Sequence, residues 1–325
     1  MSRIWDNGFD AGGMKPAKKQ SFAALRPVSA LALALLCLLA FISCGTVQGT
    51  ERPGGKTVMT VGEYDIGEEE YNYYYLNSME NDGMTDAEAK EAAKAEIVRR
   101  AAVLTMAKKY GIELSKEERD AVKAEMEAVE EQLTKQVFEE QLESYHMTRG
   151  LYLYLSQTAK LEQLLREYVM DERSGVLRYD DKAVLNDIHE NFIAIRQILI
   201  PVESGDDRSA AREKADEALR ALRAGGDFGE IAEKYGKDEA ADPVYGRYFT
   251  HGMYPAEFEK EAAALRPGEI SGVVETDVGY HVIMRIPQDE GYIDKNFEQL
   301  RYLFLNRCFN EMLDEVISGL EVVEK

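Results

Sequence analysis

Apolar and polar positions alternate or recur with a helical period along the first part of the chain. Residues 57–66 alternate, which predicts a short strand, and Gly67-Glu68-Glu69-Glu70 then opens a helix with acids in its first turn. Apolar positions every three or four residues predict long amphipathic helices over 85–110, 115–146 and 148–171. The sequence therefore predicts a mostly helical region over residues 57–190.

The period changes several times between residues 191 and 288. The pattern predicts a strand over 192–200, helices over 209–223, 227–235 and 255–265, and two strands that end at Ile286. Helical periodicity returns over 296–320, with Leu300, Phe304 and Cys308 in one apolar stripe. We expect a compact domain of strands and helices over 191–288, and a C-terminal helix within 289–325 that packs on the N-terminal helices.

An export signal is predicted near the N-terminus. Residues 31–42 are almost wholly apolar and follow Lys15, Lys18, Lys19 and Arg26, which is the order of a secretory signal. The apolar run is shorter than the ~20 residues that a spanning helix needs. It ends at Phe41-Ile42-Ser43-Cys44-Gly45, which resembles the bacterial lipobox. We expect residues 1–44 to be a signal peptide with lipidation at Cys44, and an uncleaved membrane anchor is the alternative.

The residues on either side of this signal add two expectations. Residues 1–13 carry Asp6 and Asp10 and make a poor basic n-region, whereas Met14 begins a good one, so we expect translation to start at Met14. Residues 45–56 are mostly small and polar, and they predict a flexible linker between the lipid and the folded body.

Charge and residue counts exclude several classes of function. The net charge of −21 argues against a nucleic-acid partner, because phosphate recognition needs a basic surface. The three cysteines, Cys37 and Cys44 in the signal region and Cys308 in an apolar stripe, predict no internal disulfide. The four histidines lack the spacing to cysteines or acids that is typical of zinc sites, so we expect no metal.

Five strings within 191–288 resemble the parvulin family of peptidyl-prolyl isomerases, in the order of that family. They are Ile195-Arg196-Gln197-Ile198-Leu199-Ile200, Ala224-Gly225-Gly226-Asp227-Phe228, Phe249-Thr250-His251-Gly252-Met253 with Glu257-Phe258-Glu259, Leu265-Arg266-Pro267-Gly268-Glu269-Ile270-Ser271, and Val278-Gly279-Tyr280-His281-Val282-Ile283. The opening over 58–75 resembles PrsA/SurA-type foldases. The implied fold class is α+β: a parvulin domain, with a small antiparallel sheet and surrounding helices, inserted in a mostly α-helical chaperone lobe.

The resemblance also implies a substrate pocket. Phe258 stands where parvulins place the pocket aromatic residue, and Tyr254 stands at a position that is commonly Met, with Met253 adjacent to it. Phe249 is expected to complete the pocket wall. The alternative is that these four side chains are ordinary core residues.

A polar network is the second part of the implied site. Asp238 falls at the Cys-or-Asp position of the family, and Thr276 and His281 fall at its Thr and His. Gln197 departs from the pattern, because many parvulins have His there, and glutamine forms hydrogen bonds but does not titrate. A buried histidine with a purely structural role is the alternative for His281.

The resemblance implies an enzyme that needs no cofactor, because rotation about an X-Pro bond breaks no covalent bond. We expect an extracytoplasmic foldase lipoprotein, held to a bacterial membrane by its lipid, that isomerises X-Pro bonds in unfolded exported proteins. Acids in the loop over 203–207 disfavour phosphorylated substrates. The alternative is a holdase that uses a degenerate parvulin domain only to bind peptides.

Overall fold

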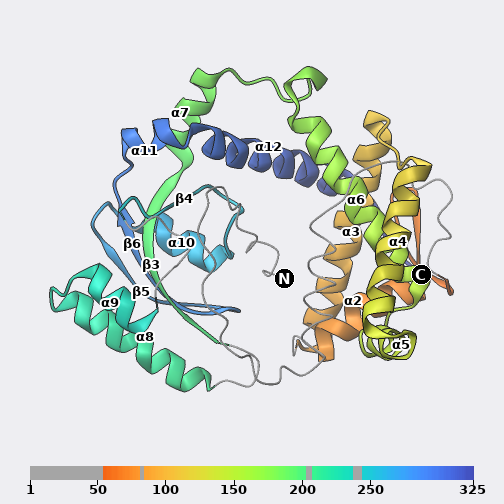
Figure 1. Ribbon diagram of the computed structural model, residues 1–325, viewed down its shortest axis with the longest axis horizontal. Helices are drawn as coiled ribbons and strands as arrows, with labels where there is room; N and C mark the ends of the chain where they lie inside the picture. The colour runs from red at the N-terminus through yellow and green to blue at the C-terminus, as the bar shows by residue number, and fades with distance from the viewer. Residues whose placement is uncertain (1–53, 81–83, 203–206, 237–243) are drawn as a thin grey trace. The chain divides into compact units, whose positions relative to one another are not determined.

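The computed structural model describes residues 54–80, 84–202, 207–236 and 244–325. These residues form two compact units, a helical unit over 54–177 and 309–325 and a sheet unit over 178–308 (Figure 1). The predicted signal peptide with Cys44, and also Asp238, lie outside the described residues.

A small sheet joins distant parts of the sequence in the helical unit. Strands β1 (Thr57–Val61), β2 (Tyr64–Gly67) and β7 (Val322–Glu324) pair in the order β2-β1-β7, and both pairings are antiparallel. The single strand predicted over 57–66 is therefore wrong: the chain turns back at Gly62, whose φ of 56° is a conformation that glycine adopts readily.

Several helices of this unit begin at residues whose side chains cap free backbone N–H groups. They are α2 (Glu68–Glu80), α3 (Asp86–Tyr110), α4 (Lys116–Leu133), α5 (Lys135–Ser144), α6 (Arg149–Met170), the 3₁₀ turn Glu172–Ser174 and the second part of α12 (Phe297–Gly319). Thr85 and Ser115 form capping boxes, and Gly111 ends α3 in the left-handed conformation.

The helices predicted over 85–110 and 148–171 are confirmed, but the one over 115–146 is wrong. The chain breaks between α4 and α5 at Thr134, which has a φ of 71° and a ψ of 148°. This break lets Phe138 and Leu142 of α5 fold back into the core that Met126 and Val129 of α4 form. Packing of the apolar face therefore overrides helix continuity here.

Charged side chains are also buried in the helical unit. Glu70 and Arg100 form an ion pair in which both side chains are almost fully buried, and Arg100 donates a hydrogen bond to the Tyr154 hydroxyl. Burial raises the pKa of Glu162, but the Arg99 and Arg166 guanidinium groups outweigh it and bring the pKa below its ordinary value. No helix within the described ranges has an apolar stretch long enough to cross a membrane.

The sheet unit has a four-stranded antiparallel sheet with helices on both faces (Figure 1). The strands lie in the order β4-β3-β6-β5. Side chains of β3 and β6 pack on α8 and α9 across one face, while Ile195, Val274 and Ile283 pack on α10 across the other. The bounds of these elements are β3 Ile193–Pro201, β4 Arg247–Phe249, β5 Ile270–Thr276, β6 Gly279–Ile286, α8 Arg208–Arg223, α9 Phe228–Tyr235 and α10 Ala256–Ala264.

The expected α+β class and the strands and helices predicted within 191–288 are confirmed. Three elements of the sheet unit were not predicted: α7 (Asp181–Asn191), α11 (Glu290–Lys295) and the short strand β4. Residues 297–308 of α12 belong to this unit, and residues 309–319 belong to the helical unit.

Candidate functional site

Three neighbouring strands bring the predicted polar residues together. His281 on β6 lies opposite Leu199 on β3 and opposite Val274 on β5. Gln197 is two residues from Leu199 and Thr276 is two residues from Val274, so the two-residue period of a strand places both on the face that carries His281. This is the face that α10 covers, and all three polar side chains are buried there.

The imidazole of His281 connects the other two side chains. Its Nδ1 lies 2.9 Å from Gln197 Oε1, and its Nε2 lies 2.8 Å from Thr276 Oγ1. An amide oxygen can only accept a hydrogen bond, so Nδ1 is the donor toward Gln197, and Nε2 pairs with the hydroxyl of Thr276. The network thus holds the ring in one orientation.

An aromatic wall adjoins this network. The ring of Phe258 meets the His281 ring edge to face, with centroids 5.1 Å apart, and it stacks on the Tyr254 ring at 4.5 Å. Phe249 contacts the Tyr254 ring at 4.9 Å, and Met253 packs in the same cluster. Phe258 and Phe249 are fully buried, whereas Tyr254 and Met253 are only partly so. The structure therefore brings together the four residues predicted to form the pocket.

The chain approaches the network again just before Asp238. The N–H of Leu199 donates to the carbonyl oxygen of Gly236 over 3.2 Å. A Cβ atom at position 236 would lie 2.0 Å from the Leu199 oxygen, which is closer than any side chain allows. Only glycine therefore fits at position 236, against the strand position that faces His281.

Charged groups lie at the end of β5, beside Thr276. Arg208 donates hydrogen bonds to Glu275 Oε1 over 2.8 Å and to the Thr276 carbonyl oxygen over 3.3 Å. The hydrogen bond from Arg208 lowers the pKa of Glu275, and the same bond raises the pKa of Arg208. The charges of Arg208 and Glu275 are therefore paired with each other.

Sequence reasoning missed one residue of this region, Glu259. The string Glu257-Phe258-Glu259 predicts a pocket role for its phenylalanine alone. The Glu259 carboxylate accepts hydrogen bonds from the segment that carries Met253 and Tyr254. An acid in the first turn of a helix that follows a turn-rich segment is the only sequence signal for such a contact.

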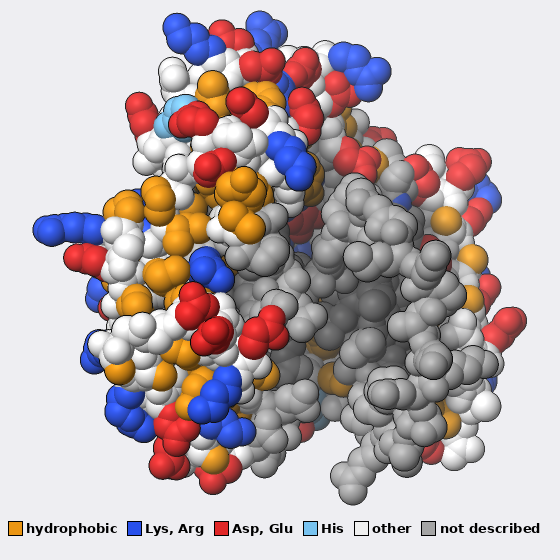
Figure 2. Space-filling model, turned by 60° about the vertical axis from the view of Figure 1, so that its left-hand side comes forward, with side chains coloured by type: hydrophobic (Ala, Val, Ile, Leu, Met, Phe, Trp, Pro, Cys, Tyr) orange, Lys and Arg blue, Asp and Glu red, His pale blue; other side chains and the backbone are white. Residues whose placement is uncertain are grey.

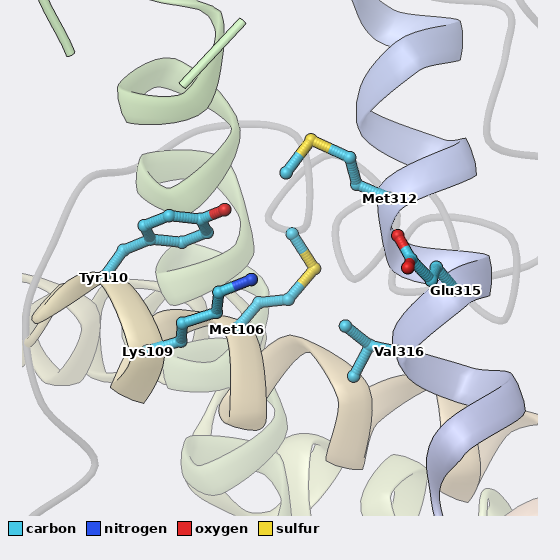
Figure 3. A pocket seen from close by; sticks show the side chains of 6 residues that line it. All are labelled: Met106, Lys109, Tyr110, Met312, Glu315 and Val316. Atoms are coloured by element: carbon cyan, nitrogen blue, oxygen red, sulfur yellow. The ribbon is translucent and has the colours of Figure 1, made fainter. Parts of the chain in front are cut away.

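A separate cavity lies in the helical unit (Figure 3). It has a volume of about 270 Å³ and lies between α3 and α12, whose side chains face each other across it. The lining residues are Met106, Lys109, Tyr110, Met312, Glu315 and Val316. Flexible methionine side chains can adapt to different apolar groups.

Within the described part of the chain, no group of three or more His, Cys, Asp or Glu side chains could hold a metal ion.

Two family models match the chain. Residues 197–286 match the PPIC-type PPIase domain, which confirms the expected peptidyl-prolyl isomerase class, and residues 20–166 match the SurA-like N-terminal domain.

Among individual proteins, the Foldase protein PrsA of Halalkalibacterium halodurans is 26% identical over 87% of this chain and 81% of its own length. The Foldase protein PrsA of Caldanaerobacter subterraneus is 30% identical over 50% of this chain, and the match spans about half (52%) of that relative. The Chaperone SurA of Burkholderia thailandensis is 36% identical over 27% of this chain and 20% of its own length.

Solved structures of similar proteins include that of the foldase protein PrsA from Streptococcus pneumoniae. It is 18% identical, covers 79% of this chain and 91% of its own, and has a TM-score of 0.36. The two domain matches and these relatives agree with the resemblance found in the sequence. The chain therefore has a PPIC-type peptidyl-prolyl isomerase domain that follows a SurA-like N-terminal domain, and it is similar to PrsA foldases and SurA chaperones.

Proposed function

We propose that this protein catalyses the cis/trans isomerisation of X-Pro bonds in unfolded exported proteins and also chaperones them. One observation carries the proposal. The buried network of Gln197, His281 and Thr276 lies directly against the aromatic wall, because the Phe258 ring contacts the His281 ring. A polar network and an apolar pocket in contact are what this reaction needs.

The reaction is limited by amide resonance, which imposes a barrier of ~18–20 kcal/mol to rotation about the peptide bond. The twisted amide has lost that resonance, so a site accelerates rotation by binding the twisted form better than the planar forms. An aromatic pocket that holds the proline ring away from water can keep one side of the bond fixed while the other side turns. Phe258, Phe249 and Tyr254 supply such surfaces.

Gln197 keeps the network complete at the position where many parvulins have a second histidine. Its amide oxygen accepts the Nδ1 hydrogen of His281, so the orientation of the ring does not depend on another titratable group. We infer that isomerase activity survives this replacement.

A non-catalytic holdase is the second candidate, and two observations favour it. Gln197 replaces a residue type that can exchange protons, and the helical unit has its own cavity with two adaptable methionines, Met106 and Met312. In this alternative the isomerase domain binds extended peptides without accelerating their isomerisation.

We also propose that the protein works outside the cytoplasm, tethered to a membrane by a lipid on Cys44. The support is the basic-then-apolar segment before Cys44 and the lipobox-like string around it. Mass spectrometry of the protein from membranes tests this, because a mature N-terminus other than a lipidated Cys44 would rule the tether out.

A protease-coupled isomerisation assay on an Ala-Pro peptide tests the catalytic proposal. The soluble protein from Gly45 onward is compared with its variants His281→Ala and Gln197→His and with the control His189→Ala, whose histidine lies on α7 and is exposed. We expect the parent and the control to accelerate isomerisation, and His281→Ala to lose at least tenfold in kcat/KM.

A parent that gives no acceleration, but that suppresses aggregation of an unfolded protein, would leave the holdase as the better description. Restored acceleration in Gln197→His would then identify residue 197 as the position where activity was lost.

A further inference from the structure

The segment Thr250–Pro255 carries two of the pocket residues and consists of turns and bends between β4 and α10. Such segments have no ladder of backbone hydrogen bonds, so their N–H groups need other acceptors. Here one carboxylate, that of Glu259 on α10, accepts from four donors of this segment.

Both carboxylate oxygens of Glu259 are fully used. Oε1 accepts from the N–H of Met253 at 2.8 Å and of Tyr254 at 2.9 Å. Oε2 accepts from the N–H of Gly252 at 3.1 Å and from His251 Nδ1 at 2.8 Å. A carboxylate has about four acceptor positions, so this arrangement fills them.

Burial makes these four bonds effective. The Glu259 side chain is only 11% exposed, whereas the side chain of its partner His251 is 88% exposed. Water therefore competes poorly for the carboxylate, and hydrogen bonds to an ionised group are the stronger kind.

A second contact holds the start of the same segment. The Thr250 hydroxyl accepts a hydrogen bond from Arg307 Nη1 at 2.7 Å, and Arg307 Nη2 donates to Asp187 at 2.7 Å. Thr250 is also buried, and its N–H points to the Met253 sulfur at 3.4 Å. The segment is thus fixed at both ends.

The role of Glu259 differs from that of an ordinary acid at a helix start. Its three backbone donors belong to residues 252–254, which precede α10, and so they are not free N–H groups of the helix itself. Glu257, in the same first turn, is exposed and supplies a negative charge near the helix N-terminus. Helix stabilisation alone therefore does not require a buried acid at position 259.

We propose that Glu259 is the positioning residue of the proline pocket. By fixing the N–H groups of Met253 and Tyr254, it holds the Tyr254 ring on the Phe258 ring. It thereby determines the affinity of the pocket for a proline ring. This inference rests on the proposed isomerase function and deepens it, because it assigns substrate affinity to a residue outside the polar network.

The test compares Glu259→Gln with Glu257→Gln in the mature protein. Both variants remove one negative charge from the same helix turn, but only the first replaces an acceptor oxygen by an amide group whose hydrogens face N–H donors. We expect KM for the Ala-Pro peptide to rise about tenfold in Glu259→Gln, with kcat within about twofold of the parent. The reason is that the pocket binds the proline ring equally in the planar and twisted forms, and weakening such binding raises KM without changing kcat.

Amide hydrogen exchange provides a readout that is independent of catalysis. In Glu259→Gln the N–H groups of Gly252, Met253 and Tyr254 should exchange at least tenfold faster than in the parent, while those of β3 and β6 remain protected. A fall in kcat at unchanged KM, or kinetics identical to those of Glu257→Gln, would overturn the proposal.

Two further arms cover the remaining outcomes. If the parent shows no catalysis, the proposed isomerase function fails, and the dissociation constant of the peptide decides the role of Glu259. A tenfold weaker complex for Glu259→Gln supports that role, and an equal one overturns it.

If Glu259→Gln does not fold, His251→Ala decides, since it removes one exposed donor only. We then expect a two- to threefold rise in KM or in the dissociation constant, and no change would overturn the proposal.

Discussion

Thr276 is the residue whose hydroxyl completes the hydrogen bonding of His281. It is buried, and it lies at the end of β5 beside the turn that leads to β6. A buried ring nitrogen that loses its donor has no water to replace it, so the cost of removing this hydroxyl falls on both stability and activity.

We predict that Thr276→Val lowers the free energy of unfolding by about 1–3 kcal/mol and lowers kcat/KM at least tenfold. Valine has nearly the same shape, so the change removes the hydrogen bond and leaves the packing. Urea unfolding and the peptide assay measure the two effects. The control is Thr158→Val, at a buried threonine of the helical unit whose hydroxyl bonds to the Tyr154 carbonyl oxygen. Activity equal to that of the control would contradict the prediction.

The sequence predicted the residues of the polar network in this site, but it did not predict the role of the neighbouring Glu259. Gln197 and His281 could be named because each lies in a short string that resembles a family motif, and Thr276 because it precedes one of these strings at the family's threonine position. The sheet register then brings the three together. Glu259 also lies in such a string, but the string does not indicate its four hydrogen bonds, because they depend on a segment that turns back over the helix start. Contacts of this kind become visible only with coordinates. The role of Asp238 remains a prediction.

Among the elements, the break between α4 and α5 is the clearest failure of the sequence pattern. The residues around it contain neither glycine nor proline, and the apolar period continues through Leu133 and Val137. Thr134 takes a backbone conformation that is essentially reserved for glycine. The missed strand β4 has a related cause, because a strand of three residues is defined by pairing with β3 and has almost no period of its own.

We predict that Thr134→Gly stabilises the helical unit by about 1 kcal/mol, because glycine adopts this conformation without strain. The same change at Thr85, which has a φ of −68° and caps α3 with its side chain, should destabilise the unit. Chemical denaturation of the two variants beside the parent provides the measurement. A loss of stability in Thr134→Gly would show that the threonine side chain contributes more than its backbone costs.

On the scale of the whole molecule, several tyrosines of the helical unit have strongly raised pKa values. Burial raises the pKa of Tyr64, Tyr73 and Tyr152 to about 12, and all three lie in this unit. Their pKa values are higher folded than unfolded, so their contribution to stability is complete below pH ~10 and is lost as the pH rises through about 12.

We predict that the free energy of unfolding falls between pH ~10 and ~12, and that Tyr152→Phe makes this fall less steep. The Tyr152 hydroxyl is buried and has no hydrogen-bond partner among the described residues, so its removal should leave stability at pH 7 unchanged or higher. Urea unfolding across this pH range tests both statements, with Tyr302→Phe as the exposed control. An unchanged slope in Tyr152→Phe would refute the first.

The sequence was most informative about the type of fold and least informative about long-range pairing. Amphipathic periods and changes of period predicted a helical region followed by a domain of strands and helices, since they reflect local burial, and the family resemblance added the α+β class. On the face that Figure 2 draws, acidic and basic side chains are interspersed. The pairing of β1 with β7 had no local signal, because β7 has only three residues and its partner lies near the other end of the described chain.

That pairing has a consequence for how the molecule assembles during synthesis. The described residues of the sheet unit form an almost continuous stretch, 178–308, whereas the helical unit needs residues 309–325 before it is complete. Lys325 and Asp65 are in contact although they lie 260 residues apart in the sequence. Closing so long a loop adds only a logarithmic entropy cost, but it is slow compared with local folding. On a chain made from the N-terminus onward, we therefore expect the isomerase domain to fold first, and the lobe that surrounds it in sequence to close afterwards.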